Sequence, residues 1–469
     1  MSYSIYRNHS LRFPGAYLMI REHLIMGRIR LSDHFTYRRL IRFTIPSIAM
    51  MVFVSVYGAV DGLFVSNYVG TTAFASLNLI MPFIMVISAT GFMMGAGGSA
   101  IIGKTFGEGN NRLAQEYFSF FIWVTLIAGV ILSILGVVFM RPISILLGAE
   151  GDMIDQCVVY GDISMISMPM FMIQYVFQSF FIVAEKPAMG FKVTVAAGCT
   201  NMVFDYVFIA LIGMGIEGAA WATVIGEYVG GLIPIVYFAR KNDSTLRIVR
   251  TRFYGRALGK ACTNGCSEFV SNVAMSLISI VFNLQLIKYA GENGVAAYGV
   301  LMYVQFMFGA ILIGYCAGVA PVISYSYGAQ THSELKNLFR KSATLMGVCG
   351  LTMAVLGFAT AVPVSEFFVG YDPLLLDMTV RGFRIFAVTF VFMGIGCFGS
   401  SLFTALNNGI ISAVISMVRT FVFRLSAVLL LPLVLGLDGI WLSTCCAEAL
   451  GFILTLIFFA AYRKKYHYL

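Results

Sequence analysis

Apolar runs of about twenty residues recur along most of the chain, and they limit the possible folds more than any other feature. Each run is long enough for an α-helix to cross the hydrocarbon core of a bilayer, which is about 30 Å thick. Of the 469 residues, 59% are hydrophobic and only 11% are charged, whereas a soluble domain carries about 25% charged residues. The sequence therefore predicts an all-α polytopic membrane protein.

We expect twelve membrane-spanning helices. Their predicted ranges are 41–69, 73–101, 118–140, 158–183, 188–213, 217–239, 262–289, 295–322, 343–368, 380–406, 410–435 and 438–462. Alternate connections are rich in Lys and Arg, most of all the stretch 240–260, and the others are acidic. Because an excess of Lys and Arg marks cytoplasmic loops, both termini are predicted to be cytoplasmic. The net charge of +9 then reflects topology, and we expect no nucleic-acid partner.

The second half of the chain repeats the first at an offset of 221 residues. The residues that coincide include Gly97 with Gly318, Gly107 with Gly328, Ala184 with Ala405, and Glu227 with Glu448. Each half has six predicted helices, an even number, so both halves insert the same way up. Parallel repeats of this kind place a substrate site between the halves. The recurrence of Glu227 and Glu448 favours a structural role for both.

The repeat sets the predicted domain boundaries. They are an N-terminal extension 1–37, an N-lobe 38–240, a linker 241–260, a C-lobe 261–462 and a tail 463–469. The extension, the linker and the tail are expected to be cytoplasmic. The extension has no apolar core of the signal-peptide type. Its residues 1–25 are expected either to have no role in the fold or to form an interfacial helix.

The N-lobe contains acidic residues that the C-lobe lacks. Asp61 lies inside the apolar run 41–69, where an ionised carboxylate costs about 2.5–3.5 kcal/mol. Under the 221-residue offset, Asp61 corresponds to Phe282 and Asp205 corresponds to Ser426. A residue that serves the shared scaffold should recur in both halves. The asymmetry therefore indicates a special function for these two carboxylates.

Depth along the helices predicts that four polar residues meet. At a rise of about 1.5 Å per residue, Asp61, Asp205 and Thr223 fall at similar depths, and Asn201 lies one turn before Asp205 on the same face. Two carboxylates, an amide oxygen and a hydroxyl suit a hard cation such as sodium. Two adjacent carboxylates also suit a proton. The alternative is a structural hydrogen-bonded pair.

The remaining candidates concern the C-lobe and the space between the lobes. Glu268 is either a second acidic site or a side chain that reaches the membrane interface. Arg424 and Glu448 are expected to form a structural ion pair, since one charge alone would be costly in the membrane. Aromatic and thioether side chains can accept organic cations in a substrate cleft. The candidates for that cleft are Tyr57, Phe177, Gln178, Met302 and Tyr303.

Several ordered stretches resemble the multidrug and toxic compound extrusion (MATE) family, and within it the MepA-like branch. They include Val60-Asp61-Gly62-Leu63-Phe64-Val65, Asn201-Met202-Val203-Phe204-Asp205, Glu217-Gly218-Ala219-Ala220-Trp221-Ala222-Thr223 and Ala405-Leu406-Asn407-Asn408-Gly409. The resemblance covers residues 26–462. It implies a V-shaped transporter with two six-helix lobes, which exports organic cations against an inward flow of sodium or protons.

The resemblance also implies roles for individual residues. The positions that match the family's N-lobe cation site are Asp61, Asn201, Asp205 and Thr223, and Glu268 matches an acidic position used in some members. Some members have an acidic residue in the tenth helix, but the range 380–406 has none. This difference favours the N-lobe site over a second site built on Glu268.

The predicted function is secondary active multidrug efflux by alternating access. We expect a monomer in the bacterial cytoplasmic membrane, cationic or amphipathic drugs as substrates, Na+ or H+ as the coupling ion, and no cofactor or other metal. One alternative is a flippase for lipid-linked oligosaccharides or other lipids on a related fold. That function would require a more cationic cavity than these helices offer. An enzyme is not expected, because all five histidines lie outside the predicted helices and no HExxH motif or phosphate-binding loop occurs.

Overall fold

The computed structural model describes residues 29–69 and 71–469, and every regular element in those ranges is a helix. Most of the predicted N-terminal extension, residues 1–28, lies outside the described residues, as does Gly70. Within the described ranges, eleven helices are long and apolar enough to cross a membrane. Two further helices, joined at a bend of 44°, pass the same test together and give a twelfth crossing. The all-α prediction with twelve membrane helices is therefore confirmed.

The helices of the two halves follow one another with short turns. The N-terminal half contains α2 (Tyr37–Tyr68), α3 (Thr71–Gly107), α4 (Asn111–Leu146), α5 (Asp152–Val183), α6 (Pro187–Asp205), the π-helix η1 (Tyr206–Leu211) and α7 (Gly215–Ala239). The C-terminal half contains α8 (Gly255–Gly328), α9 (His332–Val369), α10 (Pro373–Ala387), α11 (Thr389–Ala405), α12 (Gly409–Met417), the π-helix η2 (Val418–Phe423), α13 (Arg424–Leu435) and α14 (Leu437–Tyr466). The long helix α8 is two crossings, because its backbone breaks at Gly291, where φ is 62°.

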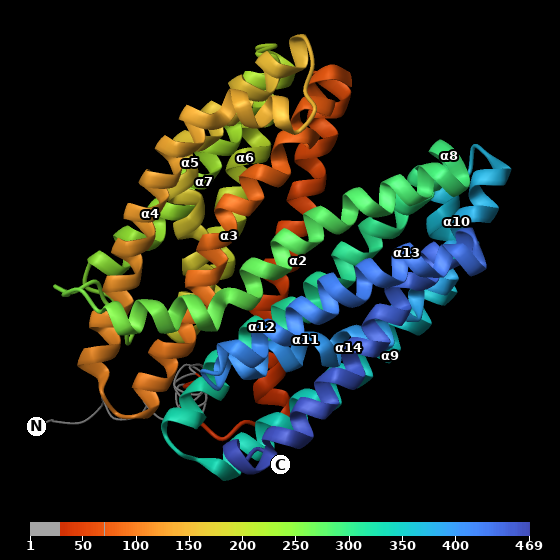
Figure 1. Ribbon diagram of the computed structural model, residues 1–469. Coiled ribbons are helices and arrows are strands. Elements are labelled where there is room, and N and C mark those ends of the chain that lie inside the picture. The colour runs from red at the N-terminus through yellow and green to blue at the C-terminus, as the bar shows by residue number, and fades with distance from the viewer. Residues whose placement is uncertain (1–28, 70) are drawn as a thin grey trace, which may run out of the picture.

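The two halves form two lobes that are arranged as a V (Figure 1). The lobe of α2–α7 and the lobe of α8–α14 lie close together at the end that carries the α3–α4 turn and the C-terminus. We call this the basic end, because its turns contain most of the Lys and Arg residues. The lobes diverge towards the opposite, acidic end. The two-lobed, V-shaped fold that the resemblance implied is therefore present.

The crossing helices extend beyond the predicted apolar runs. The clearest case is α8, which begins at Gly255, inside the predicted linker 241–260. Ala257 and Ala261, one turn apart, are both buried against the rest of the protein. The apolar run alone underestimates such a helix, because packing of a short apolar face continues the helix past the membrane edge.

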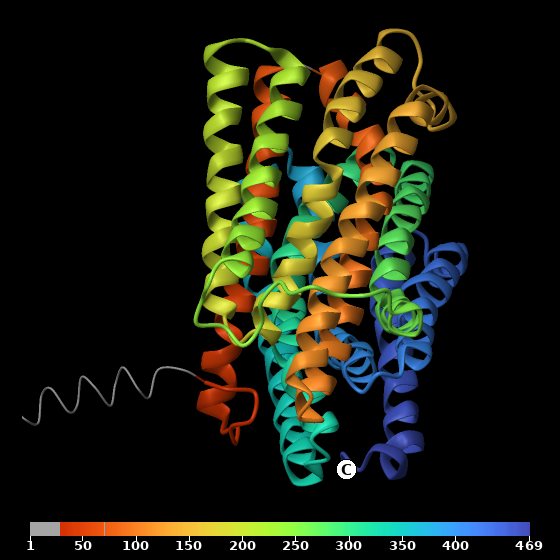
Figure 2. The same ribbon diagram turned by 90° about the vertical axis from the view of Figure 1, so that its left-hand side faces the viewer.

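The stretch between α7 and α8 runs across helices of the N-lobe (Figure 2), and polar contacts hold it there. Lys186, in the turn after α5, forms an ion pair with Asp243. The amide nitrogen of Val249 donates to Ser119 Oγ on α4 at 2.8 Å. Lys186 also holds the pKa of the Asp243 carboxyl below its usual range, by hydrogen bonding to its charged form and by attraction. The linker therefore has an electrostatic contribution to its docking at neutral pH.

Asp243→Asn should loosen this docking. At pH 7 we expect amide hydrogen exchange at Ser244 and Leu246 to become up to about fivefold faster, since exposed ion pairs contribute little. Because the pKa of Asp243 is lower in the folded protein than in the unfolded protein, its ion pair stabilises the folded state at pH values above the unfolded-state pKa. This stabilisation is lost as the pH falls through the folded-state pKa. Exchange in wild type and variant, each corrected for intrinsic rates, should therefore converge in acid. A difference that persists well below pH 3 would contradict this.

Two glycines allow the lobes to touch at the basic end. A Cβ atom on Gly107 of α3 would lie 2.1 Å from the carbonyl oxygen of Tyr325 on α8. A Cβ atom on Gly328 would lie 2.1 Å from the carbonyl oxygen of Lys104 on α3. Small residues are common where membrane helices approach closely. Gly107 and Gly328 coincide under the repeat, so the two lobes use equivalent residues to make one symmetric contact.

Gly328→Ala should force α3 and α8 apart at the basic end. We expect a loss of about 1–3 kcal/mol in stability, because overpacking displaces backbone. Gly347→Ala on α9 is the matched control, since a Cβ there meets nothing within 4 Å. The measurement is the thermal unfolding temperature of both purified variants, and we expect a lower value for Gly328→Ala than for Gly347→Ala. Equal unfolding temperatures for the two would show that the basic end is not tightly packed.

Candidate functional site

Four helices of the N-lobe bring polar side chains together. They are α2, α5, α6 and α7, and three of them contribute two residues one turn apart, which share a helix face. The residues are Tyr57 and Asp61 on α2, Tyr160 and Ser167 on α5, Asn201 and Asp205 on α6, and Thr223 and Glu227 on α7. We call this set the N-lobe cluster.

The contact between α6 and α7 places oxygen atoms in the interior. Asn201 Nδ2 donates to Thr223 Oγ1 at 3.5 Å. The helices approach closely at Gly226, where a Cβ atom would lie 3.0 Å from the Asn201 Cβ. Asp205 is completely buried, and within the described residues neither of its carboxylate oxygens has a hydrogen-bond partner. The same holds for Asn201 Oδ1. These oxygens are suited to a cation, since a buried carboxylate without a partner is costly.

Asp61 approaches this pair of helices from α2. Its carboxyl group lies close enough to that of Asp205 for the two to interact electrostatically. Asp61 Oδ1 is buried and has no partner in the described part of the chain. Two adjacent carboxylates away from water repel each other unless a proton or a cation neutralises one of them. The structure thus brings together the four residues that the sequence singled out for a cation site.

Further members of the N-lobe cluster were not predicted from the sequence. Glu227 interacts with Asp61, and its carboxyl group lies near the hydroxyl group of Ser167. The hydroxyl group of Tyr160 lies near that of Thr223. Glu227 follows Thr223 by one helical turn, and that spacing was the available signal. Tyr160 had no such signal, because a tyrosine in an apolar run is usually a packing residue.

The five predicted cleft residues differ in their surroundings. Tyr57 belongs to the N-lobe cluster, near Asp61 and Glu227. Phe177 is 1% exposed and its ring stacks on Phe238 at 5.6 Å, so it is a core residue in this structure. Its ring packs within a dense cluster of aromatic side chains on α4, α5 and α7.

The other three cleft candidates lie in separate surroundings. Gln178 is buried, and its Nε2 atom has no partner among the described residues. Met302 is half-buried and packs on the main apolar core. Tyr303 is 53% exposed and stacks on Phe368 at 5.8 Å.

The C-lobe contains a buried cluster of opposite charges. Arg424 Nη2 donates to Glu448 Oε1 at 2.9 Å, which is the pair expected from the sequence. Arg419, to which the sequence assigned no partner, donates to the other oxygen of Glu448 at 3.4 Å. Glu268 interacts with Arg419 and lies in the C-lobe, away from the N-lobe cluster. The π-helix η2, which contains Arg419, is the kind of local widening often found at functional sites.

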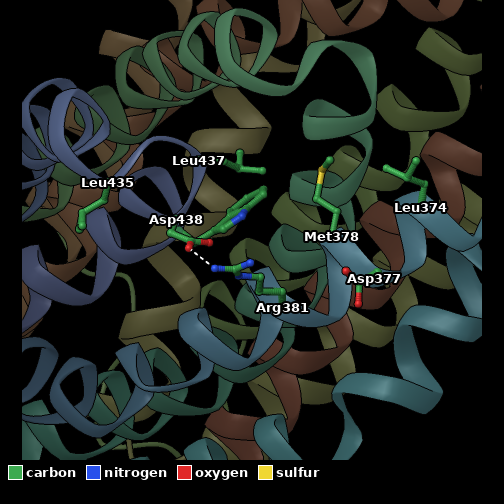
Figure 3. Close-up of a pocket in the computed structure, with 8 residues that line it drawn as sticks. Leu374, Asp377, Met378, Arg381, Leu435, Leu437 and Asp438 are labelled. Atoms are coloured by element: carbon green, nitrogen blue, oxygen red, sulfur yellow. Dashed lines mark hydrogen bonds and ion pairs between the residues drawn. The ribbon is translucent and has the colours of Figure 1, made fainter.

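A surface pocket of about 320 Å³ lies at the acidic end of the C-lobe (Figure 3). It is lined by the ends of α10, α13 and α14, and Arg381 forms an ion pair with Asp438 across it. Both charges are partly exposed and satisfy each other. The pocket lies in the other lobe from the N-lobe cluster, and among the described residues that line it no buried side-chain polar atom lacks a partner.

Comparisons with known proteins fit this architecture. The MatE family model matches residues 46–207 and 269–429, once in each lobe. The chain belongs to the MatE family. This confirms the resemblance to MATE transporters and supports the internal repeat, because each lobe contains one copy of the MatE unit.

Curated relatives and solved MATE structures extend over nearly the whole chain. It is 22% identical over 433 residues to multidrug export protein MepA of Staphylococcus haemolyticus, which covers 92% of this chain and 94% of the relative. It is 23% identical over 415 residues to MepA of Staphylococcus saprophyticus, covering 88% and 91%. A crystal structure of MATE in complex with MaL6 superposes with a TM-score of 0.86 at 21% identity, covering 92% and 98%. The crystal structure of a mutant of the Vibrio cholerae MATE transporter VcmN superposes with a TM-score of 0.85 at 19% identity, covering 92% of this chain and 98% of that one. These structures share the fold of this chain.

Proposed function

We propose that this chain is a secondary active multidrug efflux antiporter that exports organic cations and amphipathic drugs in exchange for Na+ or H+. Its membership of the MatE family and its MepA relatives support drug export. One observation carries the ion coupling: Asp205 is completely buried beside Asp61, and neither of its oxygens has a hydrogen-bond partner in the described residues. No enzymatic step, cofactor or resident metal is part of the proposal.

The proposed cycle follows from the charges of the N-lobe cluster. A cation or a proton enters between Asp61 and Asp205 and removes their repulsion. This changes the packing of α2, whose internal Pro46 leaves one backbone carbonyl without its helical donor. The lobes then rock about their contact at the basic end. Bound ion and bound drug must weaken each other's affinity by the same factor.

The distribution of charged residues supports one orientation in the membrane. The excess of Lys and Arg at the basic end supports a cytoplasmic location for that end and for both termini, in the bacterial cytoplasmic membrane. The lobes, which meet at the basic end and diverge at the acidic end, then open outwards. Each positive charge that enters releases about 2.3 kcal/mol per 100 mV of membrane potential.

The flippase alternative receives no support from the site. A pyrophosphate-linked lipid requires unpaired cations in the central cavity. Arg419 and Arg424, which are buried in the C-lobe, both bind Glu448. In the described part of the chain they therefore do not provide a free cationic surface.

Ethidium efflux from proteoliposomes tests the proposed function. Vesicles loaded with ethidium receive a Na+ gradient in one experiment and a proton gradient in another, each at zero membrane potential. We expect one of the two gradients to drive efflux well above the rate of protein-free vesicles. Wild-type protein that exports no ethidium under either gradient would overturn the proposal.

A further inference from the structure

The two lobes place an equivalent glutamate in different electrostatic surroundings. Glu227 on α7 and Glu448 on α14 coincide under the 221-residue repeat. Glu448 is 3% exposed and is neutralised by Arg419 and Arg424, whose nitrogens lie 3.4 and 2.9 Å from its oxygens. The C-lobe glutamate therefore has permanent counter-charges.

The N-lobe lacks these counter-charges. The repeat places Gly198 at the position of Arg419 and Val203 at the position of Arg424. A Cβ atom on Gly198 would lie 2.6 Å from the Phe53 ring and 3.0 Å from the Tyr57 ring, so aromatic side chains fill the space of a long cation. Within the described residues, Glu227 forms no ion pair with Lys, Arg or His.

Glu227 adds a third carboxyl group to the N-lobe cluster. It interacts with Asp61, and Asp61 in turn interacts with Asp205. The hydroxyl groups of Ser167 and Tyr57 both lie close enough to Glu227 to interact with it. Asp61 therefore stands between two carboxylates, each with its own polar neighbours.

Asp61, Asp205 and Glu227 do not form a single ion site. In the described part of the chain, no three side chains of Asp, Glu, His or Cys are placed to hold a single metal ion. Yet Asp205 is completely buried and both of its oxygens lack partners there, so at least one cation is needed next to it. A cation at Asp205 would leave the charge of Glu227 uncompensated in an apolar helix bundle.

We propose that Glu227 holds a second monovalent cation in the N-lobe, next to the one held by Asp61 and Asp205, so that two cations enter for each drug molecule exported. This inference rests on the proposed antiport function and specifies its stoichiometry. In the C-lobe the arginines take the place of exchangeable cations, which explains why only the N-lobe would couple to an ion gradient.

The proposal fixes the charge moved in each cycle. Ethidium carries one positive charge outwards, and two cations would carry two inwards, so one net charge moves inwards. At equilibrium the ratio of external to internal ethidium then rises tenfold for every 59 mV of inside-negative potential, the voltage equivalent of a factor of ten for one charge. A tenfold cation gradient at zero potential should raise the same ratio about one hundredfold, because two cations enter.

The test measures these ethidium ratios in proteoliposomes, with Na+ and proton gradients imposed separately and the potential clamped by potassium and valinomycin. Protein-free vesicles correct for passive movement of ethidium. For wild type we expect a tenfold shift per 59 mV. For Glu227→Gln we expect slower transport that no longer responds to potential, and a tenfold ratio for a tenfold cation gradient.

Asp162→Asn is the matched control. Asp162 lies on α5 in the same lobe but is not among the groups that interact with Asp61, Asp205 or Glu227 in the described residues. We expect this variant to keep the voltage response of wild type. Glu227→Asp retains the charge and should also keep it.

The outcomes separate this inference from the proposed function. Wild-type efflux that ignores the potential, or Glu227→Gln efflux that keeps the wild-type response, overturns the second cation and leaves antiport intact. Absence of ion-driven efflux in wild type overturns both. If Glu227→Gln does not reach the membrane, the wild-type ratios decide: one hundredfold supports two cations and tenfold overturns them.

Discussion

Replacing Asp61 by asparagine should abolish ion-driven drug efflux while leaving the protein folded. The amide keeps the size of the side chain but removes the charge that interacts with Asp205. The drug and the ion then lose their energetic coupling, which is typically a factor of about 5–150 in affinity. We expect the ethidium efflux rate under the effective gradient to fall to that of protein-free vesicles. Ethidium binding to the purified variant should remain and should no longer respond to the coupling ion.

A control substitution tests whether the removal of any acidic side chain from the N-lobe would have the same effect. Asp152 is exposed in the first turn of α5, at the acidic end, so Asp152→Asn should transport like wild type. Wild-type efflux by Asp61→Asn would refute the coupling role of the N-lobe cluster. Ion-insensitive ethidium binding in wild type would refute it as well.

Glu448→Gln should give the largest loss of stability. Glu448 is the shared partner of Arg419 and Arg424, and all three side chains are buried. Removing the carboxylate leaves Arg424 without a counter-charge and Arg419 with Glu268 alone, and breaking such a buried pair costs about 3–5 kcal/mol. We expect a large drop in Tm for the purified variant in detergent, together with poor accumulation in the membrane.

An exposed ion pair supplies the comparison. Asp438→Asn breaks the contact with Arg381 at the acidic end, where both side chains are partly exposed. That change should cost at most about 1 kcal/mol. If Glu448→Gln unfolds at the temperature of Asp438→Asn, the buried cluster does not stabilise the C-lobe. Replacing Glu448 and both arginines together by apolar residues should recover part of the lost stability.

These two predictions assign different roles to acidic residues of the two lobes. Asp61 lies among groups that have no fixed cation and is expected to matter for transport. Glu448 has two fixed cations and is expected to matter for folding. Glu227 shares the helix position of Glu448 but the electrostatic surroundings of Asp61. Its repeat position predicts a structural role, whereas its surroundings support the role in ion binding that we propose.

The fold followed from the sequence because membrane helices are specified locally. A run of about twenty apolar residues must form its own backbone hydrogen bonds in lipid, so each crossing can be recognised without knowing its neighbours. The 221-residue repeat then paired the crossings into two lobes. The helix ends were less predictable, as the start of α8 at Gly255 shows. Side-chain packing outside the bilayer determines them.

The sequence by itself determined the class of fold, the internal repeat, and the four polar residues that meet in the N-lobe: Asp61, Asn201, Asp205 and Thr223. Strong, local physical constraints specify these features: the cost of a charge in lipid and the spacing of residues on one helix face. Only the tertiary structure decided that Arg419 joins Arg424 on Glu448, that Glu227 joins Asp61, and that Phe177 lies in an aromatic core. Such contacts depend on the rotation and approach of helices far apart in the chain. Those are set by the packing of whole helix faces, such as the glycine contacts of α3 and α8.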